Sequence, residues 1–182
     1  CLATLWLVIY LARIRAPRHY GFLNYTCAVT GRVGSFTSLG VPTLLNRRLS
    51  RADGIIRSAI VSVVLSTVGI LSGLVGLLYL LVINLIPNFP PYRLYFNLWF
   101  FTLIPTGLTP RWAFSAISLF WVSGVIDLLA SFLRLLVILL WIHHTGDIAQ
   151  TIVITVATQI LSMALHLIWL RRIIQWHWKW PS

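Results

Sequence analysis

The stretch WAFSAISLFWVSGVIDLLASFLRLLVILLWIHHTGDIAQTIVITVATQILSMALHLIWL, residues 112–170, decides the fold of this chain. It contains only three formal charges, Asp127, Arg134 and Asp147. Asp147 lies with two histidines and a glycine in a short polar break, so we predict two long apolar helices joined by a turn. Runs of about 18 or more apolar residues indicate helices that span a bilayer, because lipid offers backbone groups no partner outside their own helix.

The composition agrees with a membrane protein. Residues of the set AVILMFWYC make up 59% of the 182 positions, and charged residues make up 9%, against about 25% charged in soluble domains. A soluble core of this size could not bury so much apolar surface. The predicted class is therefore all-α, a polytopic transmembrane helical bundle with about four to five spans and an interfacial C-terminal tail.

The expected boundaries form a single integral membrane domain over residues 1–182. Residues 1–12 are expected to be a partial span or an interfacial helix, in a chain that begins without Met and that we interpret as a processed product. Residues 13–54 are predicted to be a basic loop region with short helices, and a span over 20–46 is the alternative left open. Transmembrane helices are predicted at 55–86, 92–108, 112–142 and 148–170, followed by an interfacial tail at 171–182.

The basic residues gather at the ends of the apolar runs. The net charge of +11 comes from thirteen Arg, one Lys and three Asp. This placement predicts contact with anionic lipid headgroups and argues against nucleic acid as a partner. If 13–54 stays on one side, twelve basic residues face that side and one faces the other. The positive-inside rule then places the basic loop and the C-terminus on the cytoplasmic or equivalent side of an integral membrane protein, whichever membrane it occupies.

Polar side chains follow one face of each of the last two predicted helices. The steps of three and four residues keep them on one helical face, and the two stripes are Ser123, Asp127, Ser131 and Arg134, then Thr155, Gln159, Ser162 and His166. A short turn makes the two helices antiparallel neighbours. Folding the chain between residues 146 and 147 then predicts three pairs at equal depth: Asp127–His166, Ser131–Ser162 and Arg134–Gln159.

These six residues, from here on the polar seam, have two interpretations. The functional one is a proton relay or a polar ligand site, with Asp127 and His166 as the titrating pair. The structural one is a set of interhelical hydrogen bonds that hold two helices in register. In that case Asp127 and Arg134 neutralise each other along their own helix.

Small residues form a second continuous face, on the helix predicted at 55–86. The face consists of Ser62, Ser66, Gly69, Gly73 and Gly76. Small side chains let helix backbones approach closely in lipid and gain dispersion contacts. The face therefore predicts helix packing, against a partner protein, a second copy or this protein's own helices.

Tryptophans mark the expected membrane interfaces. Aromatic rings with a polar edge concentrate at the level of the lipid headgroups. The predicted interfacial anchors are Trp112, Trp141, Trp169, Trp176, Trp178 and Trp180.

The sequence offers no catalytic set and no complete metal site. His143, His144 and Asp147 could supply ligands, but no second cluster completes a coordination shell, and a polar turn explains them equally well. A P-loop, a GxSxG elbow and an HExxH motif are absent from the sequence, as is glutamate. We therefore expect no catalytic residues, no metal and no cofactor. These absences argue against an enzyme, and a membrane-embedded enzyme or a receptor fragment is the third interpretation left open.

The predicted function is association through helices. The small-residue face and the basic and aromatic anchoring favour a small subunit or assembly partner of a membrane complex. Its partners would be other membrane protein subunits or a second copy. The alternative is a transporter or proton-coupled carrier that uses the polar seam. The sequence identifies neither a substrate nor an organelle.

Overall fold

The computed structural model describes residues 17–38, 54–85, 93–141 and 148–174, and these residues are almost entirely helical, with no strand among them. The helices in chain order are α2 (Pro17–Ser38), α4 (Gly54–Leu85), α5 (Arg93–Leu108), α6 (Arg111–Ala116), α7 (Phe120–Trp141) and α8 (Ile148–Ile174). The predicted all-α class is confirmed. The predictions for residues 1–12, for the histidines of the turn and for the end of the tail concern residues outside those described.

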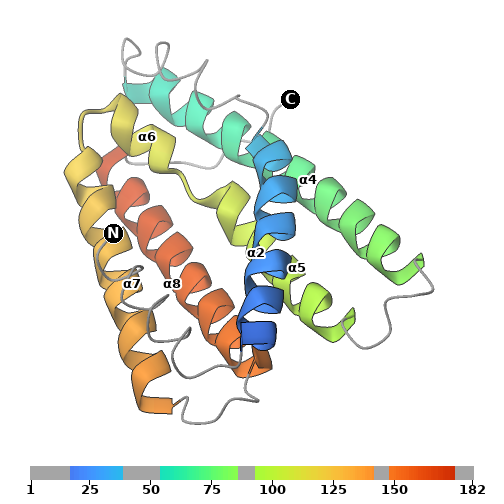
Figure 1. Cartoon of the computed structure of the whole chain (residues 1–182). Helices are drawn as coiled ribbons and strands as arrows, with labels where there is room; N and C mark the ends of the chain where they lie inside the picture. Colours follow the sequence, from blue (N-terminus) through green and yellow to red (C-terminus); the bar gives the residue numbers. More distant parts are fainter. Residues whose placement is uncertain (1–16, 39–53, 86–92, 142–147, 175–182) are drawn as a thin grey trace.

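The long helices pack side by side in the order α4, α5, α8, α7. Figure 1 shows that α5 and α8 run toward the end of the bundle that carries α6, while α4 and α7 run away from it. Helix α2 packs against α4 and α5, and the short α6 contacts α7 and α8. The start of α7 and the end of α8 therefore lie at the same end of the bundle.

Three helices are long and apolar enough to cross a membrane, among the residues described: Ile56–Leu85, Phe120–Trp141 and Ala149–Ile173. Many of their large apolar side chains are exposed, including Leu77 and Leu140, as expected for surfaces that contact lipid. Helix α5 has 16 residues, about 24 Å at 1.5 Å per residue, which is shorter than a hydrocarbon core of about 30 Å. The predicted number of four to five spans is therefore not confirmed.

The helix predicted at 112–142 is broken, which corrects the prediction. Helix α6 ends at Ala116, and α7 begins at Phe120. Between them Ser118 adopts a positive φ of 59°. The Leu119 N–H donates to the Phe114 carbonyl (2.9 Å), and the Ser118 N–H donates to the Ser115 carbonyl (3.2 Å). This pair of bonds is the Schellman helix end, in which glycine usually takes the left-handed position. A serine there gives no sequence signal.

The region predicted as a basic loop contains a helix over part of its length. Helix α2 has 22 residues and begins at Pro17, because proline favours the first turn of a helix. Its buried residues Thr26 and Thr30 face the rest of the bundle. Gly34 faces α5, since a Cβ there would lie in ordinary contact with Leu103, 3.6 Å away. Its glycines Gly21, Gly31 and Gly34 therefore do not interrupt the helix.

Part of the small-residue face packs against this protein's own α5. A Cβ added at Gly69 would lie 3.2 Å from a Leu108 methyl group, and one at Gly76 would lie 2.6 Å from Phe100. Ser62 and Ser66 donate to carbonyls one turn earlier in α4, at 2.9 Å each. Gly73 differs, because a Cβ there would meet nothing within 4 Å. Gly69 and Gly76 therefore allow α4 and α5 to pack closely.

Replacing Gly76 by alanine should lower the free energy of unfolding by about 1–2 kcal/mol relative to the matched change Gly73→Ala. The new methyl group at 76 displaces the Phe100 ring, which lies 2.6 Å away, whereas the methyl group at 73 enters open space. Both variants gain the same helix propensity, about 1 kcal/mol. Unfolding in mixed micelles, followed by circular dichroism, measures the difference. Equal stability of the two variants would contradict the α4–α5 packing.

Candidate functional site

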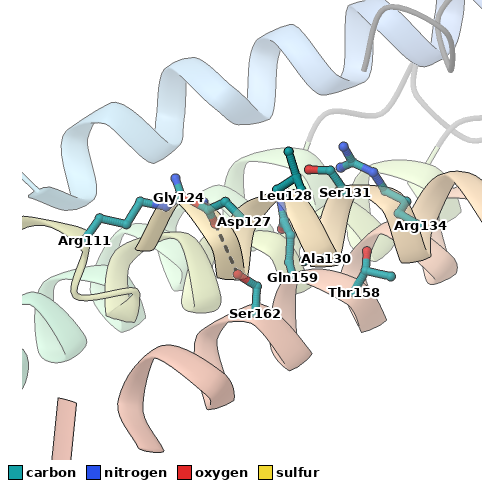
Figure 2. Close-up of a pocket in the computed structure, with 10 residues that line it drawn as sticks. All are labelled: Arg111, Gly124, Asp127, Leu128, Ala130, Ser131, Arg134, Thr158, Gln159 and Ser162. Carbon is teal, nitrogen blue, oxygen red and sulfur yellow. Dashed lines mark hydrogen bonds and ion pairs between the residues drawn. The ribbon is translucent and has the colours of Figure 1, made fainter. Parts of the chain in front are cut away.

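A polar cavity of about 390 Å³ lies along α7 and α8 (Figure 2). Its lining is unusual for two apolar helices, because charged, amide and hydroxyl side chains gather there. Five of the six residues of the polar seam line it: Asp127, Ser131, Arg134, Gln159 and Ser162. The remaining lining residues are Arg111, Gly124, Leu128, Ala130 and Thr158. The cavity thus brings most of the predicted seam together and adds an arginine from α6.

The pairing of α7 with α8 differs from the predicted pairs by one helical turn. Ser162, instead of His166, hydrogen-bonds to Asp127, with its Oγ 3.3 Å from the Asp127 Oδ1. His166 instead faces Ser123, with 3.0 Å between Nε2 and Oγ. The reason is the position of the turn. Helix α7 ends at Trp141 and α8 begins at Ile148, so the midpoint between the two helix ends falls earlier than the predicted fold point.

His166 is fully buried beneath α6 and hydrogen-bonded at both ring nitrogens. Its Nδ1 lies 2.7 Å from the Ser162 carbonyl oxygen. A carbonyl can only accept, so Nδ1 carries a proton, and Nε2 can accept from the Ser123 hydroxyl. The Phe114 ring packs edge-on against the imidazole, with centroids 5.6 Å apart. His166 therefore fixes α6, α7 and α8 to one another and connects to Asp127 through Ser162.

An ion pair lies at one end of the cavity (Figure 2). The Arg111 guanidinium donates to the Asp127 carboxylate at 2.9 Å, and the two side chains are 62% and 34% exposed. In one continuous helix, residues 111 and 127 would lie about 24 Å apart. The helix end at Ser118 folds α6 back and brings them into contact. Sequence reasoning missed Arg111 as a site residue, because nothing in the sequence signals this reversal.

Two buried polar atoms in the cavity have no hydrogen-bond partner among the residues described. They are Nε of Arg134 and Oε1 of Gln159. The predicted Arg134–Gln159 pair therefore does not form a hydrogen bond. Unpaired buried polar groups cost about 1–3 kcal/mol each, so the structure retains them at a cost. Neighbouring Thr158 is satisfied, since its hydroxyl donates to the Ile154 carbonyl at 2.9 Å.

A smaller cavity of about 120 Å³ adjoins the first. It shares Arg111, Gln159 and Ser162 with the larger cavity. Its other walls come from the end of α5 and the residue that follows it: Pro105, Thr106 and Thr109. The polar lining thus continues from the middle of α7 to the junction between α5 and α6. The sequence placed Thr106 at the end of a span and Thr109 in the loop that follows, and it gave no signal that they face the seam.

Comparisons with known proteins add no further information about this site. No protein-family model, curated protein or solved structure matches this chain. The chemistry of the cavity therefore has to be inferred from its own residues. Among the described residues, no group of three His, Cys, Asp or Glu side chains is placed to hold a metal ion.

The predicted tryptophan anchors have different surroundings. Trp141 at the end of α7 is 73% exposed, and Trp169 on α8 is 44% exposed. Trp112 is instead partly buried, and its ring packs on the hydrophobic cluster around Phe114. It therefore belongs to the packing of α6. Trp176, Trp178 and Trp180 lie outside the described residues.

Proposed function

We propose that this protein is an integral membrane carrier that binds a small hydrophilic solute in the polar cavity along α7 and α8. One observation supports this most strongly: a cavity of about 390 Å³ with three ionic side chains, Arg111, Asp127 and Arg134, lies along helices of membrane length. Ionisable groups are expensive in a bilayer and mark ion or substrate pathways.

The structural alternative explains only part of the seam. The bonds Ser123–His166 and Ser162–Asp127 do hold α7 against α8. If the seam served only to hold the two helices together, its polar side chains would all be hydrogen-bonded and the helices would pack without a cavity between them. Unpaired polar groups weaken a helix interface. The unpaired Nε of Arg134 lines a hollow instead. The hollow and its unpaired groups favour a site that receives a ligand.

The adjoining cavity suggests the direction of access. It extends the polar lining to Thr106 and Thr109, at the end of the bundle that carries α6. Arg171 and Arg172 lie in the last turn of α8, near the same end. By the positive-inside rule we assign this end to the cytoplasmic or equivalent side. Solute would enter or leave there past the Arg111–Asp127 pair.

Replacing Gly124 by leucine should abolish solute binding while leaving the protein folded. Gly124 lines the cavity, and a Cβ there would meet nothing within 4 Å. A Cβ at 124 therefore has free space, and we expect the larger leucine side chain to narrow the cavity. Gly73→Leu on α4 is the matched control, because Gly73 also faces open space but lies outside the cavity.

The measurement is thermal stabilisation of the purified protein by a panel of neutral, cationic and anionic solutes, followed by uptake of each stabilising solute into proteoliposomes. We expect at least one solute to stabilise the wild type and the Gly73→Leu variant, with uptake lost in Gly124→Leu. The proposal is wrong if no solute stabilises the wild type, or if the leucine at 124 has no effect.

Association with another membrane protein is the second candidate function. The observation in its favour is Gly73, a small residue of the packing face at which an added Cβ would meet no described residue within 4 Å. Exposed Ile70, Leu74 and Leu77 surround it on α4, and small residues flanked by apolar ones suit a helix–helix contact. The mass of the protein in mild detergent tests this candidate, which a single-chain mass would contradict.

A further inference from the structure

We propose that the solute of this cavity is a small oxyanion, such as a phosphate or a carboxylate, held by the guanidinium of Arg134. The inference rests on the proposed function and names its substrate class. It is carried by three features of the cavity: the sum of its charges, the direction of the Arg134 side chain, and the unpaired Nε.

The cavity carries one positive charge without a partner among the residues described. Arg111 and Asp127 form an ion pair at 2.9 Å, and their charges cancel. Arg134 lies seven residues further along α7, about 10 Å away, and it forms no ion pair with a described residue. An arginine in a helix of membrane length needs a counter-charge, because lipid does not solvate it.

The thiol of Cys27 on α2 does not supply that charge. It is the titratable group that interacts electrostatically with Arg134 across the bundle. Desolvation raises the pKa of the Cys27 thiol above its ordinary value, and the positive charge of Arg134 lowers it by less. The thiol therefore stays neutral at pH 7. No described residue therefore supplies the counter-charge, and an anion bound in the cavity would provide it.

The Arg134 side chain does not extend toward the nearer end of its helix. Long basic side chains in membrane helices usually reach for the closer interface, which here lies beyond Trp141, the last residue of α7. Figure 2 shows the Arg134 side chain running back along α7 toward Ser131 instead. Both residues line the cavity. The cation thus remains beside the hollow and away from the headgroups at that end.

The donor geometry selects an oxyanion. A planar guanidinium binds carboxylate or phosphate with two parallel hydrogen bonds, and its buried Nε lacks an acceptor here. The amide of Gln159, on α8, also lines the cavity and can donate its N–H or accept from a protonated oxygen. A volume of about 390 Å³ is large for one water, which occupies about 30 Å³. It accommodates a small organic or inorganic oxyanion.

The test is binding of inorganic phosphate and of acetate to the full chain in phosphatidylcholine nanodiscs, with chloride as the match for ionic strength. Arg134→Gln should weaken binding by about tenfold or more, and Arg134→Lys by several-fold, because lysine keeps the charge but loses the paired donors. Arg32→Gln, which removes an exposed cation of α2 outside the cavity, is the matched control and should bind as the wild type. Circular dichroism verifies that each variant is folded.

Phosphate could come from solution or from a lipid headgroup, and nanodiscs that contain phosphatidylglycerol separate the two sources. Unchanged affinity for soluble phosphate supports a soluble oxyanion. Competition by the lipid that depends on Arg134 supports a headgroup in the same site. Equal binding of oxyanions to the wild type and to Arg134→Gln would overturn the inference.

Failure of the inference is distinct from failure of the proposed function. If neutral or cationic solutes bind, are blocked by Gly124→Leu and ignore Arg134→Gln, the carrier stands and the oxyanion is wrong. If no solute of any charge binds, both proposals are wrong.

Discussion

Replacing Phe114 by alanine should lower the free energy of unfolding by about 4 kcal/mol, the typical cost of removing a fully buried aromatic ring. Phe114 is 0% exposed. It belongs to one buried cluster with Val61 of α4, Val122 of α7 and Leu170 of α8. Loss of the ring leaves a cavity where α6 meets three other helices, and it removes the edge-on contact with His166.

The matched control is Phe132→Ala on α7. Phe132 is 57% exposed, so the same truncation should cost less than about 1 kcal/mol. Unfolding of both variants in mixed micelles measures the contrast. Because α6 carries Arg111 to Asp127, Phe114→Ala should also weaken solute binding in the cavity, whereas Phe132→Ala should not. Equal stability of the two variants would show that α6 is not fixed by this ring.

Hydropathy alone predicts the long helices of this protein. Their apolar runs bury little of their surface within the chain and still exceed the length that a bilayer requires, as in Ile56–Leu85 and Ala149–Ile173. The polar stripes on α7 and α8 also follow from residue spacing, since steps of three and four keep side chains on one helical face. Five seam residues consequently line one cavity.

The pairing within the seam could not be predicted, because it depends on where two helices end. A shift of the turn by two residues moves every partner by about one helical turn. His166 then meets Ser123 instead of Asp127. Sequence patterns place helix ends with an error of that size, so they predict which faces meet more reliably than which residues do.

The sequence did not predict that α6 adds Arg111 to the cavity, and the reason is the way this helix ends. Its end depends on Ser118 in a left-handed conformation, which a sequence signals only when glycine or asparagine occupies the position. Arg111 consequently looked like a loop residue. Arg111 reaches Asp127 only because the positive φ of Ser118 reverses the chain between α6 and α7. Helix α2 is longer than the short helices predicted for the basic loop region, since packing against α4 and α5 overrides the low helix propensity of its glycines.

The buried hydrogen bonds of His166 make it the second position at which a substitution should have a large effect. His166→Ala should lower the free energy of unfolding by about 3 kcal/mol, through the cavity under Phe114 and the hydroxyl of Ser123 left without its partner. Ser123→Ala should cost about 1 kcal/mol, because it removes one hydrogen bond. Ser131→Ala on the same helix is the matched control, since Ser131 faces the cavity, and it should change stability by less than about 0.5 kcal/mol.

A double-mutant cycle isolates the contact between the two helices. Once His166 is alanine, removal of the Ser123 hydroxyl should cost nothing further or even stabilise, because the unpaired group disappears. The coupling free energy should therefore be about 1 kcal/mol or more. Additive effects would mean that Ser123 and His166 do not interact and that α7 and α8 pair in another register. In the register predicted from the sequence, His166 would bond directly to Asp127 and not to Ser123. The parallel cycle with Asp127→Asn should therefore give a smaller coupling free energy than the cycle with Ser123→Ala, because His166 reaches Asp127 only through Ser162.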